Sequence, residues 1–484
     1  MSNSGRNNQR LDNFANIPIE LKQFLQQDTY SLLIKGHAGT GKTTLALTIL
    51  REQDVNTNCL YISTRISPEK LFQYYWWLEN FFNKPKKTDL TEVSETESDS
   101  PVFVDARLDE PGPLFERITN ELMDIKAPTI IIDSWDAVGF LMDKEALMNN
   151  LRVLQTWRER SGARIIFVTE SPEDKTLDFL ADGVVELSQK YYDDKKVREI
   201  FFSKLRGVRI NHHSYIFSLN NAIFRSYDRY DAKQFLFYEN FTPLNKTTNK
   251  HGLTRNSHIP TGYHELDDLL GGGFPMNGIV SIELDTHINT KVAMTFLGKI
   301  VSNFIANKNP VLFQPFKGVS AAYISQHFGL SSSSQSGLVK VLLPVNKSKK
   351  ASHYLSSHGE DENKKQIEIY QNTISALKRK YPKKLLLNVL GADIAEGFQK
   401  NESRKGLEYF ISFIKSHSAI SIFVLRSSQS NLRNYLSEIS DVHLRILEIN
   451  GTLFLQSQIP RSHLYAIVPE TNSQYSGIAF HPIV

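Results

Sequence analysis

The feature that most constrains this 484-residue chain is a glycine-rich octapeptide that directly follows an apolar run at residues 30–35. The octapeptide consists of Gly36, His37, Ala38, Gly39, Thr40, Gly41, Lys42 and Thr43. Its spacing is the Walker A pattern, in which glycines let the backbone curl so that successive amides point at phosphate oxygens. A strand before such a loop and a helix from about Thr43 are the context that a phosphate loop requires. The first half of the chain is therefore predicted to bind a nucleoside triphosphate.

Each polar position of this loop has an expected task. Lys42 would neutralise the β and γ phosphates, and the Thr43 hydroxyl would ligate magnesium. The positive end of the following helix dipole favours the same anion, and Thr44 is included in the predicted nucleotide site. The expected cofactors are ATP and Mg²⁺, although the loop reads phosphates and not the base, so GTP stays an alternative.

A carboxylate at the end of a second apolar strand should hold the water shell of the magnesium. The apolar run at residues 129–132 ends in Asp133, which we identify as this Walker B residue. Residues 164–168 form a similar run that ends in Thr169 and Glu170, and this polar end is predicted to lie near the phosphates. An ordinary strand terminus is the alternative interpretation of the second run.

The order of apolar runs indicates the fold class. Runs at residues 30–35, 59–62, 102–104, 129–132 and 164–168 alternate with helical patterns, which favours a mostly parallel β-sheet flanked by helices. Two later runs, at residues 183–187 and 199–204, are separated by polar residues 191–196 and predict a hairpin. Cys59, the single cysteine, lies in one of these runs and is expected to be a buried strand thiol.

Polar, charge-rich stretches indicate the domain organisation, because such segments cannot bury enough apolar surface to fold by themselves. We expect a flexible tail at residues 1–13, a first domain at 14–226, a linker at 227–257 and a second domain at 258–484. Flexible insertions are expected at residues 84–100 and 345–365.

The bulk composition limits the partners. The chain has 56 basic and 52 acidic residues, and this formal charge of +4 does not by itself indicate nucleic acid. A short basic run at residues 347–350 is interpreted as a solvated loop, and the scattered arginines Arg426, Arg433, Arg445 and Arg461 do not indicate DNA binding. No apolar run approaches the roughly 20 residues of a membrane-spanning helix, so the expected location is the cytoplasm.

These motifs, together with the string at residues 202–207, resemble the RecA-like ATPases of the KaiC family. Residues 259–275 are similar to the entry motif of a KaiC-type domain, and residues 450–455, followed by Pro460 and Arg461, resemble its final hairpin. The resemblance implies two tandem RecA/KaiC-like domains. Within that group, residues 17–21 and 60–69 are similar to the GvpD-like archaeal regulators of gas-vesicle formation.

Two departures from the KaiC pattern affect the expected chemistry. Arg65 and Ile66 stand where hydrolysing relatives usually place paired glutamates, one of which polarises the attacking water. Hydrolysis should therefore be slow unless Glu69 or Glu170 reaches the water instead. Arg65 is expected either to pair with phosphate oxygens or to be a solvated surface residue.

A further pair and the second loop follow from the same resemblance. Lys204 and Arg206 match residues that contact the γ phosphate of a neighbouring subunit in hexameric relatives, although a solvent-facing strand is the alternative. The loop position of the second domain, residues 285–292, has no glycine. Asp285 would repel phosphate, Val292 offers no hydroxyl, and Asn388 stands in the apolar run where the second aspartate is expected. The second domain is therefore interpreted as a degenerate copy.

The sequence as a whole predicts an ATP-binding regulatory protein with weak or absent hydrolysis. Nucleotide in the first domain would control assembly, as a homo-oligomer such as a hexamer, or a protein partner such as a transcription regulator. The alternative is an active ATPase, either clock-like in signalling or a motor linked to DNA. Membrane attachment is not expected.

Overall fold

The computed structural model describes residues 16–53, 59–80, 102–122, 127–231, 257–316, 318–328, 338–342, 359–391, 403–472 and 475–484. Two compact units are present, one of residues Met1–Asp228 with Ile483–Val484 and one of Arg229–Pro482. The predicted tail, the insertion at 84–100 and most of the predicted linker lie outside the described residues. Of the predicted insertion at 345–365, residues 359–365 belong to helix α11, and the rest is also outside them.

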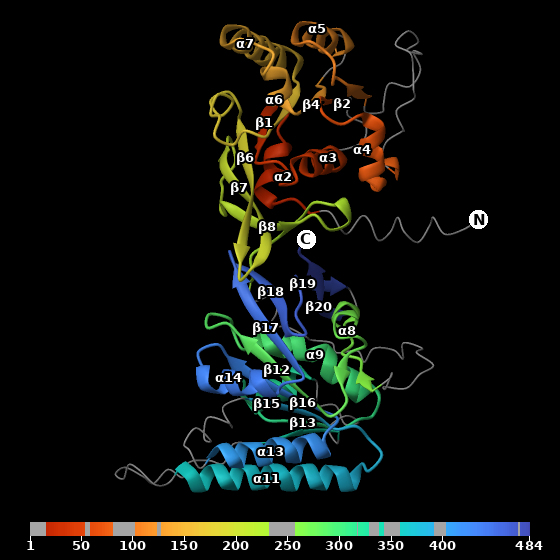
Figure 1. Ribbon diagram of the computed structural model, residues 1–484, viewed down its shortest axis with the longest axis vertical. Coiled ribbons are helices and arrows are strands. Elements are labelled where there is room, and N and C mark those ends of the chain that lie inside the picture. The colour runs from red at the N-terminus through yellow and green to blue at the C-terminus, as the bar shows by residue number, and fades with distance from the viewer. Residues whose placement is uncertain are drawn as a thin grey trace, which may run out of the picture. The chain divides into compact units, whose positions relative to one another are not determined.

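The first unit alternates strands and helices along most of its length (Figure 1). Its helices are α2 (Ile19–Leu25), α3 (Lys42–Glu52), α4 (Pro68–Tyr74), α5 (Pro111–Leu122), α6 (Trp135–Gly139), α7 (Lys144–Ser161) and the 3-10 helices η1 (Trp76–Asn80) and η2 (Asn220–Ala222). Its strands are β1 (Tyr30–Lys35), β2 (Cys59–Ser63), β3 (Val102–Asp105), β4 (Thr129–Asp133), β5 (Arg164–Thr169), β6 (Gly183–Tyr192), β7 (Lys195–Leu205), β8 (Ser214–Ser218) and β9 (Arg225–Tyr227).

The strands of the first unit form one sheet in the order β3-β2-β4-β5-β1-β6-β7-β8-β9. The first six strands in this order, from β3 to β6, are parallel to their neighbours. Strands β7, β8 and β9 follow at the β6 side and pair antiparallel. The central strand β1 is buried along its whole length. Its alternate side chains face opposite layers, because Leu32 and Ile34 pack with α2, α3 and α4 whereas Leu33 packs with α5, α6 and α7.

The aromatic segment at residues 74–77 is divided between core and surface. Trp77 is buried and packs in the same layer as α3, while Tyr74 and Trp76 are exposed. Cys59 is buried in β2, as expected. The hairpin of β6 and β7 is longer than the sequence predicted, because both strands extend through the tyrosines and lysines to a turn at Asp193 and Asp194.

The second unit has the same succession of layers. Its helices are α8 (His264–Leu269), α9 (Lys291–Ala306), α10 (Ala321–His327), α11 (Gly359–Lys380), α13 (Ser403–His417) and α14 (Ser430–Ile439). Its strands are β10 (His258–Ile259), β11 (Phe274–Pro275), β12 (Gly278–Leu284), β13 (Val311–Phe313), β14 (Val339–Val341), β15 (Leu387–Gly391), β16 (Ile420–Arg426), β17 (Val442–Ile449), β18 (Thr452–Ile459), β19 (Leu464–Asn472) and β20 (Tyr475–Pro482).

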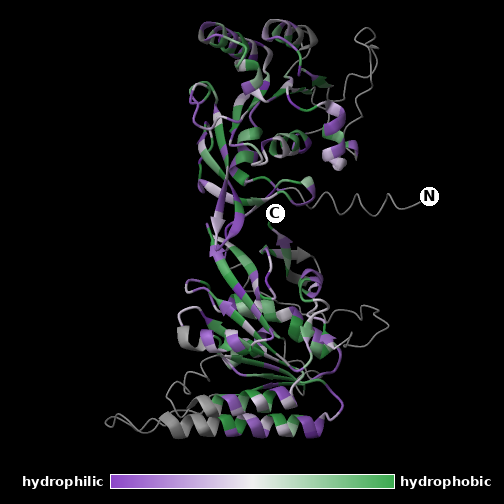
Figure 2. Cartoon of the chain, viewed as in Figure 1, coloured by the Kyte–Doolittle hydropathy of each residue, from purple (hydrophilic) through white to green (hydrophobic). Residues whose placement is uncertain are grey.

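The main sheet of the second unit repeats the order of the first, position for position, as β14-β13-β15-β16-β12-β17-β18-β19-β20. Helices α8, α9 and α10 pack on one face, and α11, α13 and α14 pack on the other. Figure 2 shows hydrophobic residues concentrated in the strands of both sheets. The prediction of two tandem α/β domains, each with a mostly parallel sheet and a late hairpin, is confirmed.

None of the helices in the described part of the chain is long and apolar enough to cross a membrane.

A glycine substitution tests the packing at the entrance of the second unit. Gly273 has φ +116°, and a Cβ there would lie 2.2 Å from the Ile259 carbonyl oxygen on the paired strand β10. We expect Gly273→Ala to lower the free energy of unfolding by about 3 kcal/mol or more, from a backbone clash added to a left-handed conformation. Denaturant unfolding of the whole chain measures this change.

Gly271 is the matched control, because it has φ +70° but no atom within 4 Å of the position that a Cβ would take. Gly271→Ala should cost only about 1–2 kcal/mol, the strain of the left-handed conformation alone. Equal destabilisation by the two variants would contradict the packing described here.

Candidate functional site

The phosphate loop lies between β1 and α3, and the hairpin of β6 and β7 closes over it. A Cβ at Gly36 would lie 2.3 Å from the Leu187 carbonyl oxygen, and one at Gly41 would lie 2.7 Å from the Leu219 side chain. Gly41 has φ +105° and forms the N-cap of α3. Backbone contact at Gly36 and the left-handed conformation at Gly41 both favour glycine, and these glycines allow the curl that lets backbone amides face a phosphate.

Lys42 is folded back onto the loop. Its side chain is buried, and Nζ donates a 2.9 Å hydrogen bond to the His37 carbonyl, which also accepts from the Thr40 hydroxyl at 2.8 Å. Burial lowers the pKa of Lys42, and the nearby carboxylates of Glu170 and Asp133 oppose that shift. A buried cation that is bonded to a neutral carbonyl group of its own loop is suited to receive a phosphate anion.

Asp133 ends strand β4 beside the first residues of the loop helix. Its Oδ2 accepts hydrogen bonds of 2.7 Å from the Thr43 hydroxyl and of 2.7 Å from the Tyr61 hydroxyl. Burial raises the pKa of Asp133, and the two hydroxyl donors act in the opposite direction. A hydroxyl and a carboxylate in direct contact are the oxygen ligands that Mg²⁺ prefers, so Thr43 and Asp133 fit the predicted cofactor.

The polar end of β5 lies beside the loop, since Thr169 pairs in register with Lys35 of β1. The Thr169 hydroxyl and the Glu170 amide donate 2.7 Å hydrogen bonds to the two carboxylate oxygens of Asp136. Burial alone would raise the pKa of Asp136, but these bonds outweigh it and hold the pKa below its ordinary value. The backbone that carries Glu170 is thereby fixed next to the loop.

Arg65 follows strand β2 and forms an ion pair with Glu170. Its side chain is 46% exposed, so it is neither core nor fully solvated. Ile66 is partly buried and its carbonyl accepts a hydrogen bond from the Ser63 hydroxyl. Glu69 is exposed near the start of α4 and interacts electrostatically with Arg107. Of Glu69 and Glu170, the two predicted substitutes for the missing glutamates, Glu170 is the one whose charge raises the pKa of Lys42.

Three polar side chains of this site were not predicted. Tyr61 supports Asp133, Gln189 donates a 2.8 Å hydrogen bond to the Gly39 carbonyl, and the Tyr75 and Thr44 hydroxyls share one of 3.1 Å. Period-2 alternation along β2 and β6 could place Tyr61 and Gln189 on a face of the sheet. It contains no signal for the residue that each side chain contacts.

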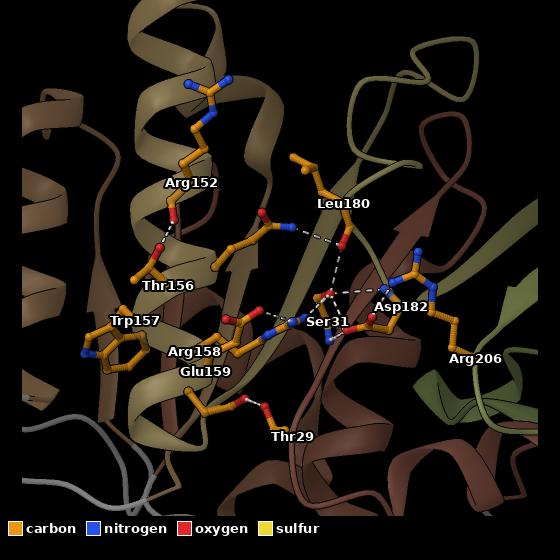
Figure 3. A network of polar contacts seen from close by, with 12 residues as sticks. Thr29, Ser31, Arg152, Thr156, Trp157, Arg158, Glu159, Leu180, Asp182 and Arg206 are labelled. Carbon is orange, nitrogen blue, oxygen red and sulfur yellow. Dashed lines mark hydrogen bonds and ion pairs between the residues drawn. The ribbon is translucent and has the colours of Figure 1, made fainter.

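Arg206 lies far from the loop of its own unit, whereas Lys204 binds Asp178, which also binds Lys35, the residue before that loop. Arg206 forms a 3.1 Å ion pair with Asp182, which also accepts from Ser31 and Arg158 (Figure 3). Ser31 is five residues before Gly36 on an extended strand, which corresponds to about 16 Å. Lys204 donates to the Asp178 carbonyl at 3.0 Å. A contact between Arg206 and phosphate would therefore have to be made with another chain.

Two arginines bond the corresponding loop of the second unit. Arg426 donates hydrogen bonds of 3.0 and 3.1 Å to the carbonyls of Thr286 and Ile288, and Arg445 forms a 3.1 Å ion pair with Asp285. Lys291 lies over the ring of Tyr323, 5.0 Å from its centroid. The loop has no glycine to allow the tight curl, and the carboxylate of Asp285 would repel a phosphate, so its residues do not fit this anion.

The strand register shows that Asn388 in the second unit does not correspond to Asp133 in the first. Thr169 pairs with Lys35 in the first unit, and Arg426 pairs with Leu284 in the second. Counting back five residues from each places Asn388, opposite Ser421, at the position that Thr129 has opposite Arg164. Asn388 is buried and hydrogen-bonded to Ser421. The place of the second aspartate follows Gly391 and lies outside the described residues.

Comparisons with known proteins agree with this geometry. Residues 22–227 match the family model of the ATPase KaiC. The chain is also similar to two proteins of Halobacterium salinarum, GvpD1, with 27% identity over 324 residues, and GvpD2, with 26% identity over 327 residues. These matches cover 62% and 63% of this chain, and they span 56% and 62% of the two relatives. The predicted resemblance of the first domain to KaiC-like P-loop ATPases, and that of the chain to GvpD proteins, are confirmed.

Tyr61→Phe tests the support of Asp133. Removing the hydroxyl should raise the pKa of Asp133 further, since a hydrogen bond to the carboxylate, with a net contribution of about 0.5–1.5 kcal/mol, is lost. Magnesium needs the deprotonated carboxylate, so magnesium-dependent nucleotide binding weakens as pH falls through this pKa. The variant should lose binding at a higher pH than the natural protein when affinity for a fluorescent ATP analogue is titrated from about pH 8 to about pH 5.

Tyr75→Phe is the control for this titration, because it removes a nearby hydroxyl that contacts Thr44 instead of Asp133. Its pH profile should match that of the natural protein. Identical profiles for all three proteins would contradict the assigned role of Tyr61.

Proposed function

We propose that this chain, a KaiC-like P-loop protein with likeness to GvpD1 and GvpD2, binds ATP with Mg²⁺ in its first domain as a regulatory switch. Bound nucleotide controls assembly or a protein partner, and hydrolysis is weak or absent. The observation that carries the proposal is the contrast between two loops of the same topological position. The first is glycine-rich and brings Thr43 into contact with Asp133, whereas the second has no glycine and its carbonyls accept hydrogen bonds from Arg426.

The residues of the first domain support binding in distinct ways. Lys42 exchanges the His37 carbonyl for phosphate oxygens, and the loop amides and the start of α3 complete the anion site. Thr43 and Asp133 hold the magnesium ion with its water shell, and Tyr61 keeps the Asp133 carboxylate in place. When bound, the ion neutralises part of the phosphate charge.

The same site is poorly equipped for hydrolysis. Proton transfer from the attacking water needs a free base near the γ phosphate. Arg65 stands where a base is expected, and it also engages Glu170, the carboxylate with the strongest electrostatic effect on Lys42. The competing proposal, an active ATPase, requires that Glu170, once separated from Arg65, be placed to accept the proton from the attacking water.

A nucleotide switch needs a binding partner that responds to it. The partner we propose is a second copy of the chain or a protein such as a transcription regulator. Members of KaiC-like families often oligomerise, and Lys204 and Arg206 would contact the γ phosphate of a neighbouring subunit. The placement of Arg206 supports this proposal, because it lies about 16 Å along the sheet from its own loop and pairs there with the partly buried Asp182. A hexamer is the assembly that the family resemblance favours.

A binding count tests the division of roles between the two domains. We expect one ATP analogue per chain in the natural protein, measured by titration calorimetry with Mg²⁺. Lys42→Ala should weaken that binding about 10- to 100-fold, because charge-assisted contacts to phosphate are lost.

The matched variant is Lys291→Ala, which removes the lysine at the same position of the second loop. It should still bind one analogue with unchanged affinity. Two analogues per chain, or loss of binding in Lys291→Ala alone, would exclude the proposed asymmetry.

The contact between subunits is tested by sedimentation velocity with and without a nonhydrolysable ATP analogue. We expect the analogue to increase the sedimentation coefficient of the natural protein and to have a smaller effect on Arg206→Ala. Arg209→Ala is the control, because Arg209 is an exposed arginine three residues further along the chain. An assembly that is unaffected by Arg206→Ala would remove the contact in trans.

A further inference from the structure

The ion pair between Arg65 and Glu170 crosses the end of the strand that carries Asp133. Arg65 follows β2 and Glu170 follows β5, and β4 lies between these two strands in the sheet. Two strand spacings correspond to about 10 Å. The two side chains therefore meet over the carboxyl end of β4, next to the loop and Asp133.

Glu170 is held differently at its backbone and at its side chain. Its amide donates to Asp136 at 2.7 Å, and the preceding Thr169 hydroxyl donates to the same carboxylate. Its carboxylate is held by Arg65, whose side chain is 46% exposed. An exposed ion pair is weak, so this carboxylate can be displaced while its backbone stays in place.

The two cations of the site each face carboxylates of the chain itself. Two cations, Lys42 and Arg65, face the carboxylates of Glu170 and Asp133, and Glu170 acts on Lys42 more strongly than Asp133 or Asp136 does. A γ phosphate bound beside Lys42 would bring more negative charge to the same place. Glu170 and that phosphate would then compete for the same two cations, because like charges at close range repel.

We infer that the Glu170 carboxylate interacts with the same two cations, Lys42 and Arg65, that the γ phosphate would contact. A nucleoside triphosphate must therefore displace this carboxylate when it binds. This inference rests on the proposed binding function and makes Glu170 a residue that sets discrimination between triphosphate and diphosphate. A diphosphate has no γ phosphate and leaves the ion pair with Arg65 intact. The displaced carboxylate is also the signal by which the domain distinguishes the two nucleotides.

The test is a set of dissociation constants for a nonhydrolysable ATP analogue and for ADP, measured by titration calorimetry with Mg²⁺ on the full chain. Glu170→Gln removes the competing charge and keeps the size of the side chain. We expect it to bind the ATP analogue about two- to fivefold more tightly, and ADP with unchanged affinity. Arg65→Gln should weaken binding of the ATP analogue and leave ADP unaffected.

Glu173→Gln is the matched control, because it removes the same charge from an exposed position three residues further along the chain. It should leave both constants unchanged. A general effect of net charge would instead tighten ADP binding in Glu170→Gln and act equally in Glu173→Gln, and this result would overturn the inference.

Two further outcomes separate this inference from the function on which it rests. If Glu170→Gln loses turnover but keeps the affinity of the natural protein for the ATP analogue, Glu170 is a catalytic base and the inference is overturned while nucleotide binding stands. If the natural protein binds neither nucleotide, the proposed function fails and the inference fails with it.

Discussion

The hydrogen bond of 2.7 Å between the Thr43 hydroxyl and the Asp133 carboxylate is the contact on which the candidate site depends. It joins the start of the loop helix α3 to the end of β4, two elements 90 residues apart in sequence. The contact exists because β1, β5 and β4 are parallel neighbours, so their carboxyl ends meet at one edge of the sheet. Burial opposes the charge of Asp133, and the Thr43 and Tyr61 hydroxyls offset part of that cost.

The second domain shows how the same topology can lose this chemistry. At the strand position where Thr169 hydrogen-bonds Asp136 in the first domain, the second domain has Arg426, which reaches into the loop and binds its carbonyls. The sheet order and the burial of the central strand are retained. The packing of the sheet and the arrangement of the loop are therefore separable in this chain, because the first depends on apolar strand residues and the second on a few loop positions.

The parts of the account that sequence could predict are those encoded in contiguous residues. The loop at residues 36–43, the strand ending in Asp133 and the alternation of strands and helices each lie within a short window, and the fold they predict is confirmed. The nucleotide, the metal and the roles of Lys204 and Arg206 remain predictions. Contacts such as Tyr61 with Asp133, Arg65 with Glu170 and Arg426 with Ile288 join distant segments. They depend on strand register and side-chain reach, for which the sequence contains no local signal.

The central claim is that the first domain binds a nucleoside triphosphate and hydrolyses it slowly or not at all. The most direct measurement is the chemical identity of the bound nucleotide after the full chain has been incubated with Mg²⁺ and ATP and recovered by gel filtration. The account predicts that intact ATP is released from the recovered protein on denaturation, in amounts that do not decline during prolonged incubation. Recovery of ADP that forms at a steady rate, and that fails to form in Asp133→Asn, would contradict it.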